Sequence, residues 1–241
     1  MTAKRTRTGP GIAFLALSQY ISITKQKISM NTKLVVFDLD GTLVDSSQTI
    51  YDATIQTFIK LGIDYKLTRE DLDKRIGAHF QDIFEEFNIY VEDFEYFIEV
   101  YKVYYFEYMN SSHLYPGVGE TIKALHERGI KIALLTTKGQ DQAERIIEHF
   151  EFTKYFSLIM GRHPDLKVKP DPEPLLYIAS QLNVPNEQVL MTGDTEFDIR
   201  CGKNAGIRTC ACEYGYRTRE FLESENPDHI IEKIVDIMEL V

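Results

Sequence analysis

The stretch Leu34-Val35-Val36-Phe37-Asp38-Leu39-Asp40-Gly41-Thr42-Leu43-Val44-Asp45 decides the fold of this chain. Its first four residues are apolar, which is typical of a strand buried on both faces in a parallel sheet. Asp38 and Asp40 follow where that strand should end, and Gly41 lets the backbone turn sharply. Neighbouring carboxylates there repel each other and are costly to desolvate without a cation. A turn alone would not explain Asp38 directly after the apolar run, so the stretch predicts a charged site.

The chain beyond residue 114 alternates apolar runs with amphipathic segments. The runs predict strands at 130–135, 155–160, 189–192, 207–212 and 230–231, with helices between them and a final helix at the C-terminus. This alternation predicts an α/β fold, a Rossmann-like parallel sheet with helices on both faces. We assign residues 30–44 and 114–241 to this core domain.

Residues 45–113 have a different, helical pattern. One amphipathic helix ends at Gly62, and Thr68 begins a second as its N-cap, with Asp71 at the capping-box position and an end at Gly77. Two more helices are predicted at 79–88 and 91–110, the last with an aromatic stripe that we interpret as packing between helices. About 70 residues are thus inserted after the first strand, and they predict a separate four-helix cap domain.

The composition and the net charge limit the classes of function that this chain can have. The chain has 241 residues, 44% of them apolar and 27% charged, and a net charge of −10. These proportions are ordinary for a globular protein, and the acidic charge argues against nucleic acid or an anionic membrane as a partner. The three cysteines, an odd and clustered set, predict reduced thiols and a cytoplasmic location. No apolar stretch approaches the roughly 20 residues needed to span a bilayer.

Residues 1–29 carry five basic residues and no acidic one. Their short apolar run resembles a secretory signal, but no small-residue cleavage site follows it. Met30 stands just before the first strand, and we therefore favour a leader added by an upstream start, which is not part of the fold.

Polar groups follow four of the predicted strands. Asp38 and Asp40 follow the first, Thr136 the second, and Asp194 with Asp198 the fourth, while Lys169 lies in the loop after the third. Ligand sites in open parallel sheets lie beyond the carboxyl ends of the strands. We therefore expect these side chains to meet at one edge of the sheet.

The sequence Asp38-Leu39-Asp40-Gly41-Thr42 after an apolar strand resembles the first motif of the haloacid dehalogenase superfamily. Thr136, Lys169 and the Asp194/Asp198 pair match the other motifs, so the resemblance covers residues 33–212. Most members of that superfamily are magnesium-dependent phosphotransferases that use an aspartate nucleophile.

The resemblance implies a role for each matching residue. Asp38 would be the nucleophile that forms an aspartyl-phosphate, and Asp40 would be the general acid and base. Thr136 would donate a hydrogen bond to the phosphoryl group, and Lys169 would neutralise charge there. The expected Mg²⁺ ligands are Asp38, Asp194 and the backbone carbonyl of Asp40, with Asp198 orienting a ligand or a water.

Further residues are expected to contact the substrate. Gly41, Thr137 and Lys138 lie beside the motifs, and Thr136-Thr137-Lys138 departs from the Thr-Asn-Lys of phosphoglycolate-phosphatase-type relatives. We expect this difference to affect substrate preference. In the cap, Arg75 could hold a second anionic group and Gly77 permits a close approach. His79 is interpreted as the first residue of a helix.

The resemblance implies a Mg²⁺-dependent phosphatase for a small phosphorylated metabolite, similar to phosphoglycolate phosphatase. A mutase of the β-phosphoglucomutase type and an inorganic pyrophosphatase are alternatives on the same scaffold. A non-catalytic phospho-acceptor domain of receiver type is disfavoured by the cap, which such domains lack. We expect a monomer or a weak homodimer.

Overall fold

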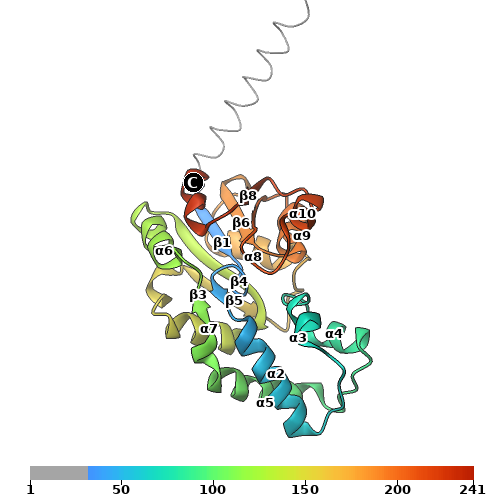
Figure 1. The fold of residues 1–241 in the computed structure, drawn as a ribbon. Coiled ribbons are helices and arrows are strands. Elements are labelled where there is room, and N and C mark those ends of the chain that lie inside the picture. The colour runs from blue at the N-terminus through green and yellow to red at the C-terminus, as the bar shows by residue number, and fades with distance from the viewer. Residues whose placement is uncertain (1–31) are drawn as a thin grey trace, which may run out of the picture.

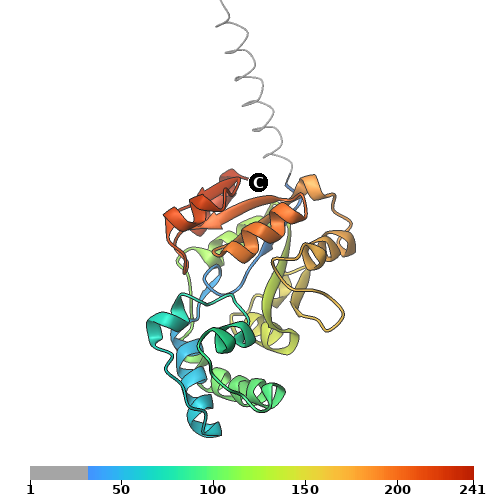
Figure 2. The ribbon, with the colours of Figure 1, turned by 90° about the vertical axis from the view of Figure 1, so that its right-hand side faces the viewer.

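A computed structural model describes residues 32–241 of the protein, shown in Figure 1. The predictions made for residues 1–29 lie outside the described residues. The described chain forms a parallel sheet with helices on both faces and a set of helices beyond one end of the sheet (Figures 1 and 2).

The sheet has six parallel strands in the order β5-β4-β1-β6-β7-β8. Their bounds are β1 Leu34–Phe37, β4 Lys131–Gly139, β5 Leu158–Arg162, β6 Val189–Gly193, β7 Arg208–Cys212 and β8 His229–Ile231. The chain proceeds from β1 to β4 and β5 on one side, then crosses to β6 on the other. The order therefore reverses at β1, and the carboxyl end of β1 is the position where such sheets bind ligands.

Strand β1 is buried on both faces, as its sequence predicts. Val35 and Phe37 pack on one face, against α6 (Val118–Glu127), α7 (Gln140–His149) and the 3₁₀ helix η4 (Ile234–Glu239). Leu34 and Val36 pack on the other, against α8 (Glu173–Gln181) and α9 (Glu196–Asn204). Because successive side chains of a strand point to opposite faces, a continuous apolar run is what this position requires.

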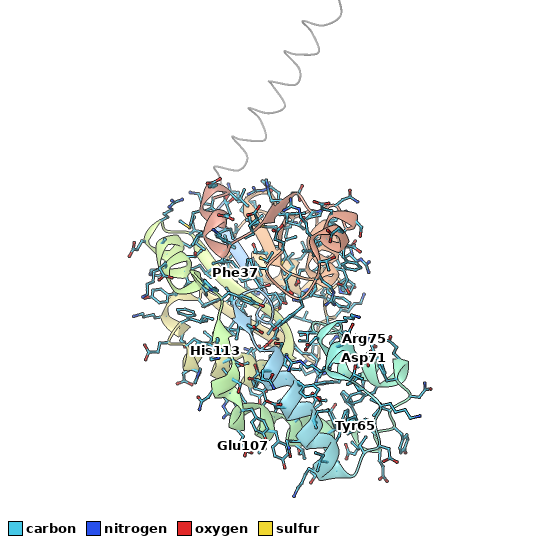
Figure 3. All side chains as sticks on the ribbon, in the orientation of Figure 1. Phe37, Tyr65, Asp71, Arg75, Glu107 and His113 are labelled. Atoms are coloured by element: carbon cyan, nitrogen blue, oxygen red, sulfur yellow. The ribbon has the colours of Figure 1, made fainter. Side chains whose placement is uncertain are left out.

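Four α-helices lie between β1 and α6 in the chain, and we call residues 47–111 the helical insert. They are α2 (Ser47–Leu61), α3 (Arg69–Asp73), α4 (Phe80–Glu86) and α5 (Phe94–Glu107), followed by η1 (Met109–Ser111). The insert lies beyond the carboxyl ends of the strands (Figures 1 and 2). Aromatic side chains pack between its helices, and Phe97 contacts Phe58 and Phe84. Figure 3 shows Tyr65 and Arg75 on the insert, apart from Phe37 in the sheet.

A short antiparallel pair joins the insert to the sheet. Strand β2 (Val44–Asp45) pairs with β3 (His113–Leu114), so the chain leaves and re-enters the α/β part at one place. This pair was not predicted from the sequence, because two-residue strands carry no periodic pattern.

Other elements differ from the predictions in extent. Strand β4 continues through 136–139 with a register shift against β5, so the polar residues lie within the strand and not after it. Helix α3 ends at Asp73, before Gly77, and α10 (Arg219–Ser224) was not predicted. The C-terminal segment is a 3₁₀ helix instead of an α-helix, because its hydrogen bonds join residues three apart. The remaining 3₁₀ helices are η2 (Thr153–Tyr155) and η3 (Asn186–Gln188).

Within residues 32–241, no helix is long and apolar enough to cross a bilayer.

Candidate active site

The ends of β1 and β6 bring the first two carboxylates together. The amide of Asp38 donates to the carbonyl of Thr192 at 2.9 Å, which continues the pairing of the two strands by one residue. Asp194 follows β6 directly, as Asp38 follows β1. The exposed fractions are 4% for Asp38 and 0% for Asp194, so both carboxylates are withdrawn from bulk water.

Three buried carboxylates form one cluster. Asp38, Asp194 and Asp198 each offer an oxygen atom, and these atoms lie within 4.8 Å of one another. Glycines make room for them. A Cβ atom on Gly41, which has φ +80°, would lie 2.2 Å from Asp194 Oδ2, and one on Gly215 would lie 2.3 Å from Asp194 Cβ. Only glycine fits at these positions while the carboxylate of Asp194 remains in place.

Hydrogen bonds fix the orientation of Asp194. The hydroxyl of Thr42 donates to its Oδ1 at 3.1 Å, and the backbone amide of Tyr216 donates to its Oδ2 at 2.8 Å. Residues on two separate segments therefore hold this one carboxylate, which is the arrangement expected of a pre-organised ligand.

Asp198 is held through both of its oxygens. Its Oδ2 accepts hydrogen bonds from the amide and the hydroxyl of Thr195, at 3.0 and 2.7 Å, and its Oδ1 accepts one from Lys169 at 2.6 Å. The first turn of α9 thus positions Asp198, and Asp198 in turn positions Lys169.

Lys169 contacts the carboxylates of both Asp38 and Asp198. Its Nζ lies 2.8 Å from Asp38 Oδ1 and 2.6 Å from Asp198 Oδ1, and its side chain is buried. Burial acts to lower the pKa of Lys169, but Asp198 and Asp38 outweigh it and raise that pKa above its ordinary value. Lys169 is therefore a permanent positive charge beside Asp38.

Burial has the opposite consequence for the carboxylates. It raises the pKa of Asp38 to about 7, although Lys169 acts to lower it, and the charges of Asp198 and Asp40 add to the rise. Burial and the charges of Asp198 and Asp38 likewise raise the pKa of Asp194 well above its ordinary range. Without a cation, burial therefore favours the protonated forms of Asp38 and Asp194.

The donor set fits a hard divalent cation. Four carboxylates (Asp38, Asp40, Asp194 and Asp198) meet two ammonium groups (Lys138 and Lys169), which leaves an excess of negative charge in a buried place. Oxygen ligands in such a number are those that Mg²⁺ prefers. The residues present therefore fit a metal ion at the three-carboxylate cluster.

The side chain of Asp40 points to a different set of partners. Its Oδ2 lies 3.1 Å from Lys138 Nζ, and its Oδ1 accepts a short hydrogen bond from Ser46. Lys138 Nζ also lies 4.4 Å from the centre of the Tyr105 ring. Asp40 is thus outside the three-carboxylate cluster by its side chain and faces the helical insert.

The end of β4 supplies Thr136 and Thr137. The Thr136 hydroxyl is buried and accepts a hydrogen bond from the amide of Lys138 at 3.3 Å. The Thr137 hydroxyl donates to the carbonyl of Gly77 in the insert, at 3.5 Å. Gly77 has φ +101°, and a Cβ atom there would lie 3.1 Å from Thr195 Cγ2. Gly77 therefore joins the insert to β4 and to the start of α9, while its expected contact with a substrate stays a prediction.

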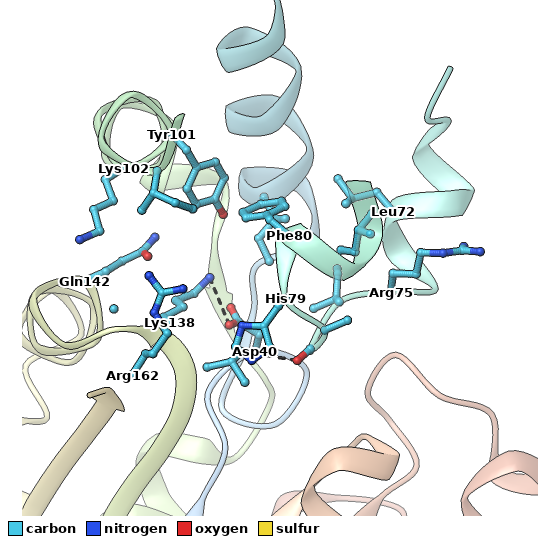
Figure 4. Close-up of a pocket in the computed structure, with 18 of the residues that line it drawn as sticks. Asp40, Leu72, Arg75, His79, Phe80, Tyr101, Lys102, Lys138, Gln142 and Arg162 are labelled. Carbon is cyan, nitrogen blue, oxygen red and sulfur yellow. Dashed lines mark hydrogen bonds and ion pairs between the residues drawn. The ribbon is translucent and has the colours of Figure 1, made fainter. Parts of the chain in front are cut away.

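Arg75 is not brought to the carboxylates. Its guanidinium forms an ion pair with Glu86, with Nε 2.7 Å from Glu86 Oε2, and donates to the carbonyl of Asp71. Figure 4 shows this guanidinium directed away from Asp40. With these partners, Arg75 does not present a free charge for a second anionic group, contrary to our expectation.

A pocket separates the insert from the sheet. It has a volume of about 90 Å³, and Asp40 and Lys138 lie at one side of it (Figure 4). His79 lines it as the residue before α4, in agreement with its interpretation as a helix start. The pocket places Asp40 beside a space in which a leaving group could lie.

Several residues of the site were missed from the sequence. Thr195 could have been found, because Thr195 and Asp198 have the spacing of a capping box. Tyr216 follows β7, a fifth strand end that we did not consider. Thr42 belongs to the first motif but was given no role from the sequence, and Ser46 gives no sequence signal, since its hydroxyl is distinguished only by the carboxylate that it contacts.

Comparison with known proteins identifies the family. The model of the haloacid dehalogenase-like hydrolases matches residues 35–212, most of the chain and all of the polar strand ends. The chain belongs to the haloacid dehalogenase-like hydrolases. The resemblance stated from the sequence is thus confirmed, as is the α/β fold class.

Two proteins named as pyrophosphatases are similar to this haloacid dehalogenase-like hydrolase over most of its length. It is 32% identical to the pyrophosphatase PpaX of Halalkalibacterium halodurans over 218 residues, which cover 88% of this chain and 98% of the relative. It is 33% identical to the pyrophosphatase PpaX of Listeria innocua over 216 residues, 86% of this chain and 95% of the relative.

A solved structure is also similar. A protein described as a predicted phosphoglycolate phosphatase from Haemophilus somnus has a TM-score of 0.78 and 27% identity, with 87% of this chain and 97% of that chain covered. Family and relatives together make the chain an enzyme, a hydrolase of the phosphatase type.

Proposed function

We propose that this enzyme is a Mg²⁺-dependent phosphatase that hydrolyses a small phosphorylated metabolite through an aspartyl-phosphate on Asp38. The observation that carries the proposal is the position of Lys169, 2.8 Å from Asp38 and 2.6 Å from Asp198, beside a cluster of three buried carboxylates. A lysine and a divalent cation around one carboxylate suit the transfer of a charged phosphoryl group.

Asp38, Asp194 and the backbone carbonyl of Asp40 would hold the Mg²⁺. The bound cation would supply charge neutralisation for the phosphoryl oxygens and keep the Asp38 carboxylate ionised. Asp198 would act by orientation, because both of its oxygens already accept hydrogen bonds from Thr195 and Lys169.

Asp38 would attack the phosphorus atom, forming one P–O bond as the bond to the leaving oxygen breaks. Asp40 would donate a proton to that leaving oxygen and later take one from the water that hydrolyses the aspartyl-phosphate. The hydrogen bond from Ser46 and the ion pair with Lys138 hold Asp40 at the edge of the pocket. Thr136 and the amide of Thr137 would donate to the phosphoryl oxygens.

We also propose that the helical insert acts as a cap domain that excludes bulk water and selects the leaving group. Its contacts with the α/β part through Gly77 and Thr195 support this role. The three buried cysteines, none of them in a disulfide, support a cytoplasmic location. We expect the enzyme to act alone or as a weak homodimer.

Inorganic pyrophosphate is a second candidate substrate, favoured by the names of the relatives. Two of them, at 32% and 33% identity, are called pyrophosphatases. No observation favours the mutase alternative.

The experiment that tests the proposal measures phosphate release from p-nitrophenyl phosphate with and without Mg²⁺. We expect activity that needs the metal and is abolished in Asp38→Asn. Asp165→Asn is the control, because the Asp165 side chain is 90% exposed. Full activity of Asp38→Asn would remove the nucleophile assignment. A panel of phosphate esters and pyrophosphate, ranked by kcat/KM, would then identify the substrate.

A further inference from the structure

The pocket beside Asp40 is markedly basic. Four basic side chains line it (Arg75, Lys102, Lys138 and Arg162), against one acidic side chain, that of Asp40. Three of the four have carboxylate partners: Arg75 pairs with Glu86, Lys102 with Asp141 and Lys138 with Asp40. Within residues 32–241, Arg162 has neither an ion pair nor a side-chain hydrogen bond. Its charge is therefore available to a ligand.

Buried polar atoms of the pocket also lack partners. Gln142, on α7, is 3% exposed, yet its side-chain nitrogen has no hydrogen-bond partner among the described residues. The buried Nε2 atom of His79 likewise has no hydrogen-bond partner among the described residues. Figure 4 shows the amide of Gln142 directed toward the side of the pocket where Lys138 and Arg162 lie. A buried polar group without a partner is costly, so a ligand that supplied the missing bond would be stabilised.

Arg162 is fixed in place by the sheet. Arg162 is the last residue of β5 and pairs with Gly139 of β4, the residue that follows Lys138 in the chain. The side chain of Gln140 accepts a hydrogen bond from the amide of Gly161 at 2.7 Å and donates to the carbonyl of Ile159 at 3.0 Å. These two bonds hold the end of β5, so that the backbone of Arg162 is positioned before any ligand binds.

The charges that act on His79 also indicate a positive electrostatic potential in the pocket. Burial lowers the pKa of His79, and the nearby positive charges of Arg162 and Lys169 act in the same direction, against the opposing charge of Asp82. An anion in the pocket would therefore meet a positive potential from the sheet side.

We infer that Arg162 and Gln142 form a subsite for a compact anionic group on the leaving part of the substrate. The inference rests on the proposed function, in which Asp40 protonates the leaving oxygen at the edge of this pocket. The pocket, with a volume of about 90 Å³, has room for a small anion such as a carboxylate or a phosphoryl group. The substrate class is a phosphate compound whose leaving group carries a carboxylate or a second phosphoryl group.

The test compares substrates that differ in the charge of the leaving group. Pyrophosphate and 2-phosphoglycolate carry an anionic leaving group, whereas ethyl phosphate carries a neutral one of similar size. We expect kcat/KM for at least one anionic substrate to exceed that for ethyl phosphate by roughly tenfold or more, and the preferred one assigns the anion as phosphate or carboxylate. In Arg162→Met the ratio should fall by roughly 10- to 100-fold, because a charge-assisted hydrogen bond is lost.

Two further variants sharpen the test. Arg145 lies on the same helix as Gln142 but is exposed, with its guanidinium over the Phe106 ring, so Arg145→Met should leave the ratio unchanged. Arg162→Lys keeps the charge and should restore part of the preference. An equal loss on the anionic and neutral substrates in Arg162→Met, or no loss on either, would overturn the subsite.

A binding measurement separates this inference from the proposed function. Titration of Asp38→Asn with pyrophosphate by calorimetry needs no turnover, and adding Arg162→Met should weaken binding by roughly tenfold or more. If p-nitrophenyl phosphate is not hydrolysed while this difference persists, the proposed function fails and the subsite stands. Equal binding to both variants would sink the subsite alone.

Discussion

Lys169 and Asp198 form a close buried contact beside Asp38, with 2.6 Å between Lys169 Nζ and Asp198 Oδ1. The same ammonium lies 2.8 Å from Asp38 Oδ1. One lysine thus contacts two carboxylates, one directly after β1 and the other on α9. Its role in stability and its proposed role in catalysis cannot be separated by position, but they can be separated by measurement.

Replacing Lys169 by Met should destabilise the protein strongly. The change leaves Asp38 and Asp198 buried without their ammonium partner, and breaking a buried pair in this way costs roughly 3–5 kcal/mol of the free energy of unfolding. Urea denaturation in the absence of metal would measure it. Lys167→Met is the matched control, because Lys167 pairs with Asp171 while its side chain is 72% exposed, and an exposed pair contributes at most about 1 kcal/mol. Equal effects of the two substitutions would contradict the buried geometry.

Asp40→Asn should separate proton transfer from metal binding. The Asp40 side chain faces Lys138 and Ser46, not the three-carboxylate cluster, and its expected metal ligand is a backbone carbonyl that the substitution keeps. We expect Mg²⁺ affinity to change by less than about threefold and turnover to fall by roughly 10²–10⁴. Calorimetry and steady-state kinetics give the two numbers. A loss of metal affinity as large as the loss of turnover would mean that the side chain binds the metal.

Mg²⁺ binding should weaken as the pH falls. Burial raises the pKa of Asp38 from 3.8 to about 7, so at pH 6 its carboxyl carries a proton that a cation must displace, whereas at pH 8 it does not. Affinity should fall by roughly tenfold per pH unit below 7 for each proton displaced. Calorimetric titration at pH 6 and pH 8 checks this, and the dependence should be weaker in Asp38→Asn, in which Asp194 is the remaining ligand with a raised pKa. Equal affinities at the two pH values would contradict it.

The raised pKa of Asp38 also determines how the stability of the metal-free protein changes with pH. Because the folded state binds the Asp38 proton more tightly than the unfolded state, this group's contribution to stability is present below pH 3.8 and is lost as the pH rises to about 7. The increase in Tm on adding Mg²⁺ should therefore be larger at pH 8 than at pH 6.

The α/β core could be predicted because its signals are local. The run Leu34–Phe37 is apolar at every position, and a strand between two layers of helices requires that pattern. The carboxylates at its end then had to share an edge with the ends of neighbouring parallel strands. Asp38, Asp194 and Asp198 meet for that reason.

The pocket could not be predicted in the same way. Arg162 follows an ordinary apolar strand, and nothing in its neighbours shows that it lacks an ion pair while Arg75 has one. Our choice of Arg75 rested on its place beside Gly77. The contact with Glu86, eleven residues on, depends on how α3 and α4 pack, and a single sequence does not contain that information.

Gly77→Ala should impair catalysis through the contact between the helical insert and the α/β part. Gly77 has φ +101°, which an alanine adopts only with strain, and the added Cβ would lie 3.1 Å from Thr195 Cγ2. The loop must then move away from Thr195 and Thr137. Since small displacements near a reacting group reduce rates, we expect kcat/KM to fall by roughly 10- to 100-fold, measured with p-nitrophenyl phosphate.

Gly62→Ala is the control that separates the effect of backbone strain from the effect of the contact between Gly77 and Thr195. Gly62 ends α2 with φ +65°, but a Cβ atom there would meet nothing within 4 Å. Both substitutions should lower the free energy of unfolding by roughly 1–2 kcal/mol, because both force an alanine into the left-handed region. Only Gly77→Ala should lower kcat/KM. If the two variants lose activity equally, strain in the insert is the cause, and the contact of Gly77 with Thr195 has no part in closing the site.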